Sequence, residues 1–178
     1  MRLLGKILFG LVLTILFLLP LFSWIAAEPA PYSDPEEFFT IDIPDGWKAD
    51  DSGHMGKGVI MKGPAGPAGM EPIIHLLHEP AGVVTLDVQW PTHLGRLRYE
   101  LEKVKFLKLE DFEKDVPPFS QAHYSYAEGG KAFQALTRMF LSGERFFLIT
   151  AAAPEGEFDG LQPLFQRTFD SLSPGGER

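Results

Sequence analysis

Residues 119–152 read FSQAHYSYAEGGKAFQALTRMFLSGERFFLITAA. It contains three runs rich in β-branched and aromatic residues, and two glycine-containing turns separate them. This pattern predicts an antiparallel meander. The predicted strands span 119–126, 131–141 and 145–152, and the turns are Glu128-Gly129-Gly130 and Ser142-Gly143.

Two helices and five further strands are predicted around the meander. Downstream, one continuous apolar face at helical spacing predicts a helix over 158–172. Upstream, leucines at 94, 97 and 101 predict a helix from Thr92 to Lys105. Strands are predicted at 38–43, 58–62, 73–78, 83–90 and 106–109, with residues 79–82 as a hairpin turn and 110–115 irregular. The order of strands, helix, strands and helix indicates an α+β fold in which helices pack on a sheet.

An apolar leader precedes these elements. Ile7 to Ala27 is a run of 21 residues without a charge, and Arg2 and Lys6 precede it. The run could cross a hydrocarbon core of about 30 Å as a membrane-entry helix, or act as a signal peptide cleaved before Glu28. The sequence leaves cleavage and anchoring open. Both predict that the body is exported to the periplasm or another extracytoplasmic face of the membrane, and that the leader contacts the membrane.

The charge and the cysteine content exclude several functions. Beyond residue 27 the chain carries 14 basic and 24 acidic residues, a net charge of −10, so we expect no nucleic-acid partner. The absence of cysteine excludes disulfides, thiolate metal sites and cysteine nucleophiles. We expect neither a cofactor nor a metal. The predicted organisation is a leader at 1–27, a Pro- and acid-rich extended linker at 28–37, a globular domain at 38–173 and a tail at 174–178.

No residue pattern identifies a catalytic site. Gly-x-Ser-x-Gly is absent, as is a serine followed three residues later by lysine. His75 and His78 lie three apart on a predicted strand, so they should point to opposite faces and not share a metal. Asp50, Asp51 and His54 match no calcium loop and are expected to be a solvated loop. Trp47 and Trp90 are either an aromatic binding shelf or, more commonly, core residues.

The first predicted helix carries the best candidate for a partner surface. Its net charge is +2 inside an acidic body, because four cations outnumber Glu100 and Glu102. An anionic lipid or an acidic protein could bind there, although a solvated helix face is the commoner explanation. The cations are Arg96, Arg98, Lys103 and Lys105.

The two ends of the domain resemble a known family. Residues 39–47, FTIDIPDGW, resemble the opening of PsbP-like domains, the superfamily of the photosystem II extrinsic P subunit and a Ran-binding yeast protein. Residues 145–154 and the helix ending in Thr168-Phe169-Asp170-Ser171-Leu172 look like that family's last strand, loop and helix. The resemblance implies an α-β-α sandwich around a central antiparallel sheet. It also implies relatives that mostly bind partners or serve assembly, and it transfers no catalytic residues.

We therefore expect a non-enzymatic, exported binding or assembly domain of the cell envelope, whose protein or small-molecule partner is unknown. The alternative is an exported hydrolase whose catalytic residues are dispersed along the chain. That alternative predicts a deep pocket holding a histidine or paired carboxylates with displaced pKa values.

Overall fold

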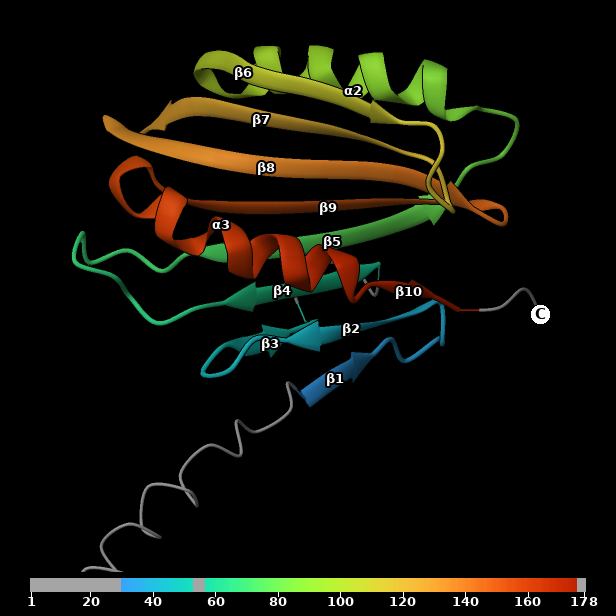
Figure 1. The fold of residues 1–178 in the computed structure, drawn as a ribbon, viewed down its shortest axis with the longest axis horizontal. Helices are drawn as coiled ribbons and strands as arrows, with labels where there is room; N and C mark the ends of the chain where they lie inside the picture. The colour runs from blue at the N-terminus through green and yellow to red at the C-terminus, as the bar shows by residue number, and fades with distance from the viewer. Residues whose placement is uncertain (1–29, 53–56, 176–178) are drawn as a thin grey trace, which may run out of the picture.

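The computed structural model describes residues 30–52 and 57–175, so the leader and His54 lie outside the described residues. A seven-stranded antiparallel sheet forms its centre, in the order β3-β4-β5-β9-β8-β7-β6 (Figure 1). A smaller sheet, β1-β2-β10, accompanies it. The strands are β1 Ala30–Ser33, β2 Phe39–Ile43, β3 Lys48–Asp50, β4 Gly58–Lys62, β5 Ile73–Pro80, β6 Glu102–Phe112, β7 Phe119–Glu128, β8 Lys131–Ser142, β9 Arg145–Pro154 and β10 Ser173–Pro174.

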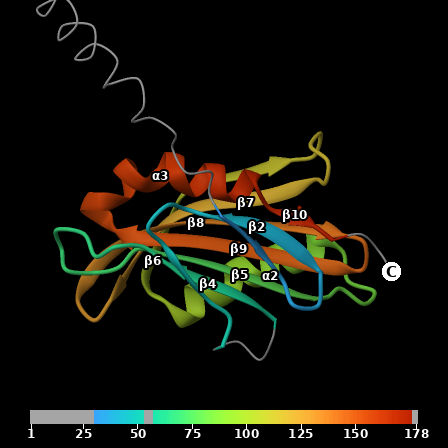
Figure 2. The same cartoon turned by 90° about the horizontal axis from the view of Figure 1, so that it is seen from below.

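The two described helices cover opposite faces of the large sheet (Figure 2). Helix α2, Leu86–Glu100, packs on β6 and β8, while α3, Glu155–Asp170, packs on β8, β9 and β2. The small sheet lies beside α3. This arrangement is an α+β fold with helices on both sides of an antiparallel sheet, which confirms the predicted fold class for the described residues.

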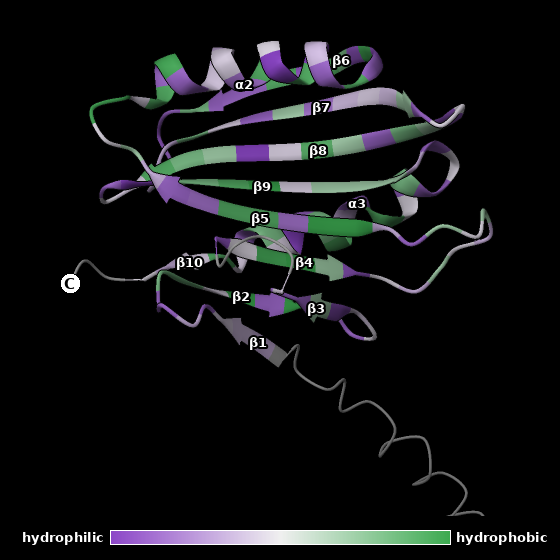
Figure 3. Cartoon of the chain, turned by 180° about the vertical axis from the view of Figure 1, so that it is seen from behind, coloured by the Kyte–Doolittle hydropathy of each residue, from purple (hydrophilic) through white to green (hydrophobic). Residues whose placement is uncertain are grey.

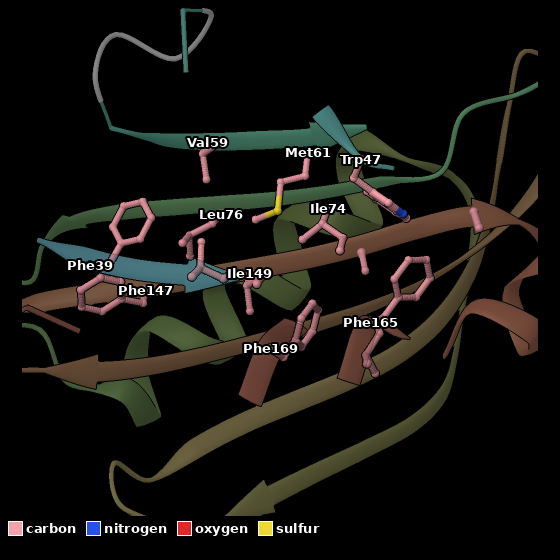
Figure 4. Packing of buried hydrophobic residues seen from close by; sticks show 14 of the residues in the cluster. Phe39, Trp47, Val59, Met61, Ile74, Leu76, Phe147, Ile149, Phe165 and Phe169 are labelled. Carbon is pink, nitrogen blue, oxygen red and sulfur yellow. The ribbon is translucent and has the colours of Figure 1, made fainter. Parts of the chain in front are cut away.

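The larger core lies between the sheet and α3. Alternate residues of β4, β5 and β9 point into it, because side chains alternate between the faces of a strand. They meet the aromatic face of α3, as Figure 4 shows for Phe165 and Phe169. Trp47 packs edge-on against Phe165, with ring centroids 6.2 Å apart, and closes one end of this core.

The predicted meander is confirmed. Strands β7, β8 and β9 pair in an unbroken register from Phe119↔Phe140 to Ser142↔Arg145. Both turns place glycine in the left-handed region, with φ 56° at Gly129, 79° at Gly130 and 56° at Gly143, where a side chain would be strained. The strands predicted at 38–43, 58–62 and 73–78 and the last helix are also present, with small shifts of their ends.

The predicted strand over Val83–Trp90 is wrong. Helix α2 already begins at Leu86, and the Thr85 carbonyl accepts hydrogen bonds from the Val88 and Gln89 amides. The β-branched residues at 83–85 suggested a strand, but Trp90, His93 and Leu97 form a buried face at helical spacing. Residues 79–82 therefore connect a strand to a helix and are not a hairpin turn.

The predicted helix end at Lys105 is also wrong. Helix α2 ends at Glu100, and β6 begins at Glu102 and continues to Phe112. Lys103 adopts φ 55°, and an irregularity interrupts the pairing between residues 102 and 105. Val104 and Phe106 pack on the same cluster as the helix leucines, so their apolar character fitted either element. Pairing with β7 makes this segment a strand and not a continuation of the helix.

The linker prediction is wrong for part of its length. Residues 30–33 form β1, which pairs with β2 from Ala30↔Ile43 to Ser33↔Thr40. The buried Asp34 carboxylate then accepts hydrogen bonds from the Glu36 and Phe38 amides and holds the turn into β2. Pro174, expected in the tail, pairs with Phe39 in β10. Within the described ranges, no helix has the length and apolar character needed to cross a bilayer.

Candidate functional site

A cavity of about 160 Å³ lies between α2 and the large sheet, and we call it the α2 cavity. Figure 3 views the molecule from behind relative to Figure 1, with α2 next to β6 and β7 and followed across the sheet by β8, β9 and β5. The lining residues come from β5, β8 and β9, from α2 and from the residue before β4. They are Lys57, Leu77, His78, Glu79, Gln89, Thr92, His93, Arg96, Met139, Phe146 and Leu148.

The sheet supplies an apolar floor. Leu77 of β5 and Met139 of β8 both pair with Leu148 of β9, so the three side chains lie in one row across adjacent strands. Phe146 lies two residues before Leu148 and therefore points to the same face. The floor offers a ligand dispersion contacts and no hydrogen bonds, which suits an apolar group.

The helix supplies a polar wall. Gln89, Thr92 and Arg96 follow one another at spacings of three and four residues and therefore share one side of α2. Gln89 Nε2 donates to Glu79 Oε1 at 3.3 Å, which joins the helix to the end of β5. The Thr92 hydroxyl donates to the Val88 carbonyl at 2.9 Å. The cavity therefore has an apolar side and a hydrogen-bonding side.

His93 is the buried titratable group of this wall. It is 5 % exposed, its ring stacks on Trp90 at 5.8 Å, and Arg96 Nη2 donates to its Nδ1 at 3.5 Å. Burial, and to a lesser extent the Arg96 guanidinium, lowers the pKa of His93 from 6.5 to about 4. The imidazole is therefore neutral at neutral pH. Because Nδ1 accepts a hydrogen bond, the ring proton resides on Nε2.

His78 lies at the edge of the cavity, but its ring points to the opposite face of β5 from Leu77 and packs among Phe38, Phe39 and Phe147. It joins the large sheet to the N-terminal segment. Arg145 Nη1 donates to its Nδ1 at 3.0 Å, and the Arg145 guanidinium lies over the Phe38 ring, 3.5 Å from the centroid. The Nε2 atom of His78 is 3.9 Å from Asp34 Oδ1. Burial lowers the pKa of His78, and the positive charge of Arg145 lowers it further. This cluster fixes the end of β1 against β5 and β9.

The structure separates the four cations of the predicted partner surface. Arg96 and Arg98 are on α2, whereas Lys103 and Lys105 are on β6. Arg96 lines the α2 cavity, and Arg98 points elsewhere, with its guanidinium 4.9 Å from the centroid of Phe106. All four are exposed. The expectation that they share one helix is wrong, because the helix ends before Lys103.

The structure also places the other candidate histidines, tryptophans and aspartates that it describes. His78 is buried and His75 partly exposed, on opposite faces of β5, as their spacing predicts. Trp47 and Trp90 belong to cores on opposite sides of the sheet and form no shelf. Asp50 accepts from the Ser52 amide and hydroxyl, and Asp51 accepts from the Tyr32 hydroxyl. Within the described ranges, no group of three histidine or acidic side chains is placed to hold a metal.

Sequence reasoning found Arg96 but missed the cavity itself. Its floor residues were predicted only as strand residues, since their convergence depends on the pairing of β5 with β9. His93 was the available signal, because it lies between Trp90 and Leu97 on what becomes the buried face of α2. The incorrect boundary between strand and helix at residue 91 concealed that signal.

Solved structures of other proteins share this fold. A protein of unknown function from Pseudomonas aeruginosa superposes with a TM-score of 0.62 and 16% identity, covering 85% of this chain and 100% of its own. Cyanobacterial PsbP from Synechocystis superposes with a TM-score of 0.62 and 14% identity, covering 85% of this chain and 95% of its own. LpqN of Mycobacterium tuberculosis, involved in cell envelope biogenesis, superposes with a TM-score of 0.60 and 16% identity, covering 84% of this chain and 91% of its own. No family model and no curated protein matches the chain. The predicted PsbP-like resemblance is confirmed as a likeness of fold.

Proposed function

We propose that this chain, which has the PsbP-like fold, is an exported non-catalytic domain that binds a small ligand in the α2 cavity. The observation that carries the proposal is the cavity itself, with an apolar floor on the sheet and a polar wall on α2. Concave sites with a mostly apolar lining and a few placed polar groups are typical of ligand pockets.

The hydrogen bonds of the histidines support binding over catalysis. A general base must lie within hydrogen-bond reach of the nucleophile that it activates. Instead, the rings of His78 and His93 accept from arginines, and His123 Nε2 lies 2.8 Å from Gln134 Oε1. The Nδ1 lone pairs of His93 and His78 are thus engaged by arginines, which are not nucleophiles, and His123 Nε2 donates to an amide oxygen. The α2 cavity does hold a histidine with a lowered pKa, His93, as the hydrolase alternative predicts. Its Nδ1 contacts Arg96 and not a nucleophile, and this contact favours the binding domain.

The leader and the fold of LpqN support an extracytoplasmic location. LpqN is involved in cell envelope biogenesis, and cyanobacterial PsbP has the same fold. Only Glu28 and Pro29 separate the leader from β1, and so short a connection reaches about 10 Å at most. Asp34, just beyond the other end of β1, lies near His78 at the cavity edge. A retained anchor would thus hold the domain close to the membrane, at the end of β1 away from Asp34.

Export is tested by expressing the full chain with a C-terminal tag in a bacterial host. Protease added to intact spheroplasts is expected to digest the body without lysis, because the body lies outside the membrane. The intact mass then distinguishes the two forms: a chain beginning at Glu28 has been cleaved, and a full-length chain is anchored. A body that is digested only after lysis contradicts export.

Catalysis is tested on the protein recovered from that experiment. We expect no turnover of ester, glycoside or peptide substrates above the uncatalysed rate. The matched variants are His78→Ala and His93→Ala, which remove the two cavity-lining histidines. Turnover that either variant abolishes would refute the non-catalytic proposal and favour the hydrolase.

A further inference from the structure

We propose that the ligand of the α2 cavity is a small monocarboxylate whose apolar body is one ring or a chain of about six carbons. The inference rests on the proposed binding function and adds the chemical class of the ligand. It follows from three properties of the cavity: its size, its floor and the charges at its wall.

The size limits the apolar body. Pockets for drug-sized ligands enclose roughly 300–1,000 Å³. The α2 cavity encloses about 160 Å³, close to the engineered cavity of roughly 150 Å³ that binds benzene. A long acyl chain or a sugar would not fit inside it. The floor of Leu77, Met139, Phe146 and Leu148 then requires that the enclosed part be apolar, because a polar group there would lose its hydrogen bonds to water.

The charges at the wall select the head group. Two cations, Arg96 and Lys57, line the cavity together with one carboxylate, Glu79. Glu79 already accepts a hydrogen bond from Gln89, which satisfies part of its capacity. An ammonium head would therefore meet two like charges and a carboxylate already engaged with an amide. An anionic head would meet two opposite charges.

Arg96 is placed to receive a carboxylate. Its ion pair with Glu100 is long, 3.9 Å, and the two side chains are 55% and 57% exposed, so the pair holds the guanidinium weakly. The contact with the buried His93 ring directs the same guanidinium toward the cavity. A planar guanidinium with five donors matches a carboxylate in a bidentate arrangement, which a hydroxyl cannot provide. The structure thus pairs an apolar compartment with an arginine at its wall.

The test compares three probes that share one chain: hexanoate, hexan-1-ol and hexylamine. Each is titrated at pH 7 into the full chain, in nanodiscs if the leader is retained, and followed by calorimetry and by amide chemical shifts. We expect hexanoate to bind at least tenfold more tightly than the alcohol or the amine. Shifts should concentrate at residues such as Leu77, His93 and Leu148. Dodecanoate should bind no more tightly than hexanoate, because the cavity is full.

Two variants of the same helix assign the head group. Arg96→Gln should weaken hexanoate at least tenfold, since the bidentate partner is lost. The matched control is Arg98→Gln, which removes an exposed arginine two residues away that does not line the cavity, and it should change the affinity less than twofold. Circular dichroism confirms that both variants fold.

The outcomes separate this inference from the function on which it rests. If hexanol or hexylamine binds as tightly as hexanoate, or if Arg96→Gln has no effect, the carboxylate class is wrong although the cavity still binds ligands. If dodecanoate binds much more tightly, the size limit is wrong. If no probe shifts the amide signals of the cavity residues, and xenon does not bind in the α2 cavity either, both proposals fail.

Discussion

Replacing Phe165 by alanine is expected to lower the free energy of unfolding by about 3–5 kcal/mol. Phe165 is fully buried in the larger core, where its ring lies 5.6 Å from Phe158 and meets the edge of Trp47. Truncation leaves a cavity between α3 and the sheet, because Phe165 is fully buried in the cluster that joins them. Urea denaturation measures the loss as a lower midpoint at constant slope.

The matched control for this substitution is Val83→Ala. Val83 is 99% exposed in the connection before α2, so its truncation should change the free energy of unfolding by less than about 0.5 kcal/mol. A loss below about 1 kcal/mol for Phe165→Ala would mean that the core closes over the missing ring, contrary to the close packing of Figure 4.

Acid is expected to destabilise the protein through His93, by about 3 kcal/mol between pH 7 and pH 4. The pKa of His93 is about 4 in the folded protein and 6.5 as an ordinary histidine. Between these values the unfolded chain binds a proton that the folded protein does not bind. The His93 contribution is therefore complete above pH 6.5 and is lost progressively as the pH falls toward 4. The lowered pKa of His78 acts in the same direction.

The substitution His93→Phe isolates this contribution. Phenylalanine keeps a ring beside Trp90 and cannot be protonated, so the variant should lose about 3 kcal/mol less than the wild type between pH 7 and pH 4. Urea denaturation at both pH values gives the comparison. Val88→Ala, an exposed change on the same helix, should retain the wild-type difference. An equal loss in all three proteins would contradict a buried neutral His93.

Local signals account for the parts of the fold that the sequence predicted well. The meander from Phe119 to Ala152 combines long runs of strand-forming residues with glycines at both turns, and α3 has an uninterrupted apolar face. Each signal lies within one element or one hairpin. Where local signals conflicted, as at Val83–Trp90 and around Lys103, the prediction was wrong, because the burial of Trp90 and the pairing with β7 outweigh local preference.

The candidate site was much less predictable than the fold. Arg96 was recognised as part of a basic surface, but its neighbours in the cavity come from residues 57 to 148 of the chain. Leu77 and Leu148 become partners only when β5 pairs with β9, across a separation of 71 residues. No local pattern encodes that contact. The same pairing places His78 beside Arg145, which sequence reasoning also missed.

The α+β class, the meander, the last helix and the PsbP-like resemblance could all be predicted from the amino-acid sequence, which also predicts the apolar leader and the acidic body. These properties depend on the spacing of residues that are close in the chain. Three features required the folded structure: α2 begins at Leu86, β1 pairs with β2, and a cavity lies between α2 and the sheet. These features depend on burial and on strand pairing between distant segments. Such contacts contribute to stability only once the chain has folded.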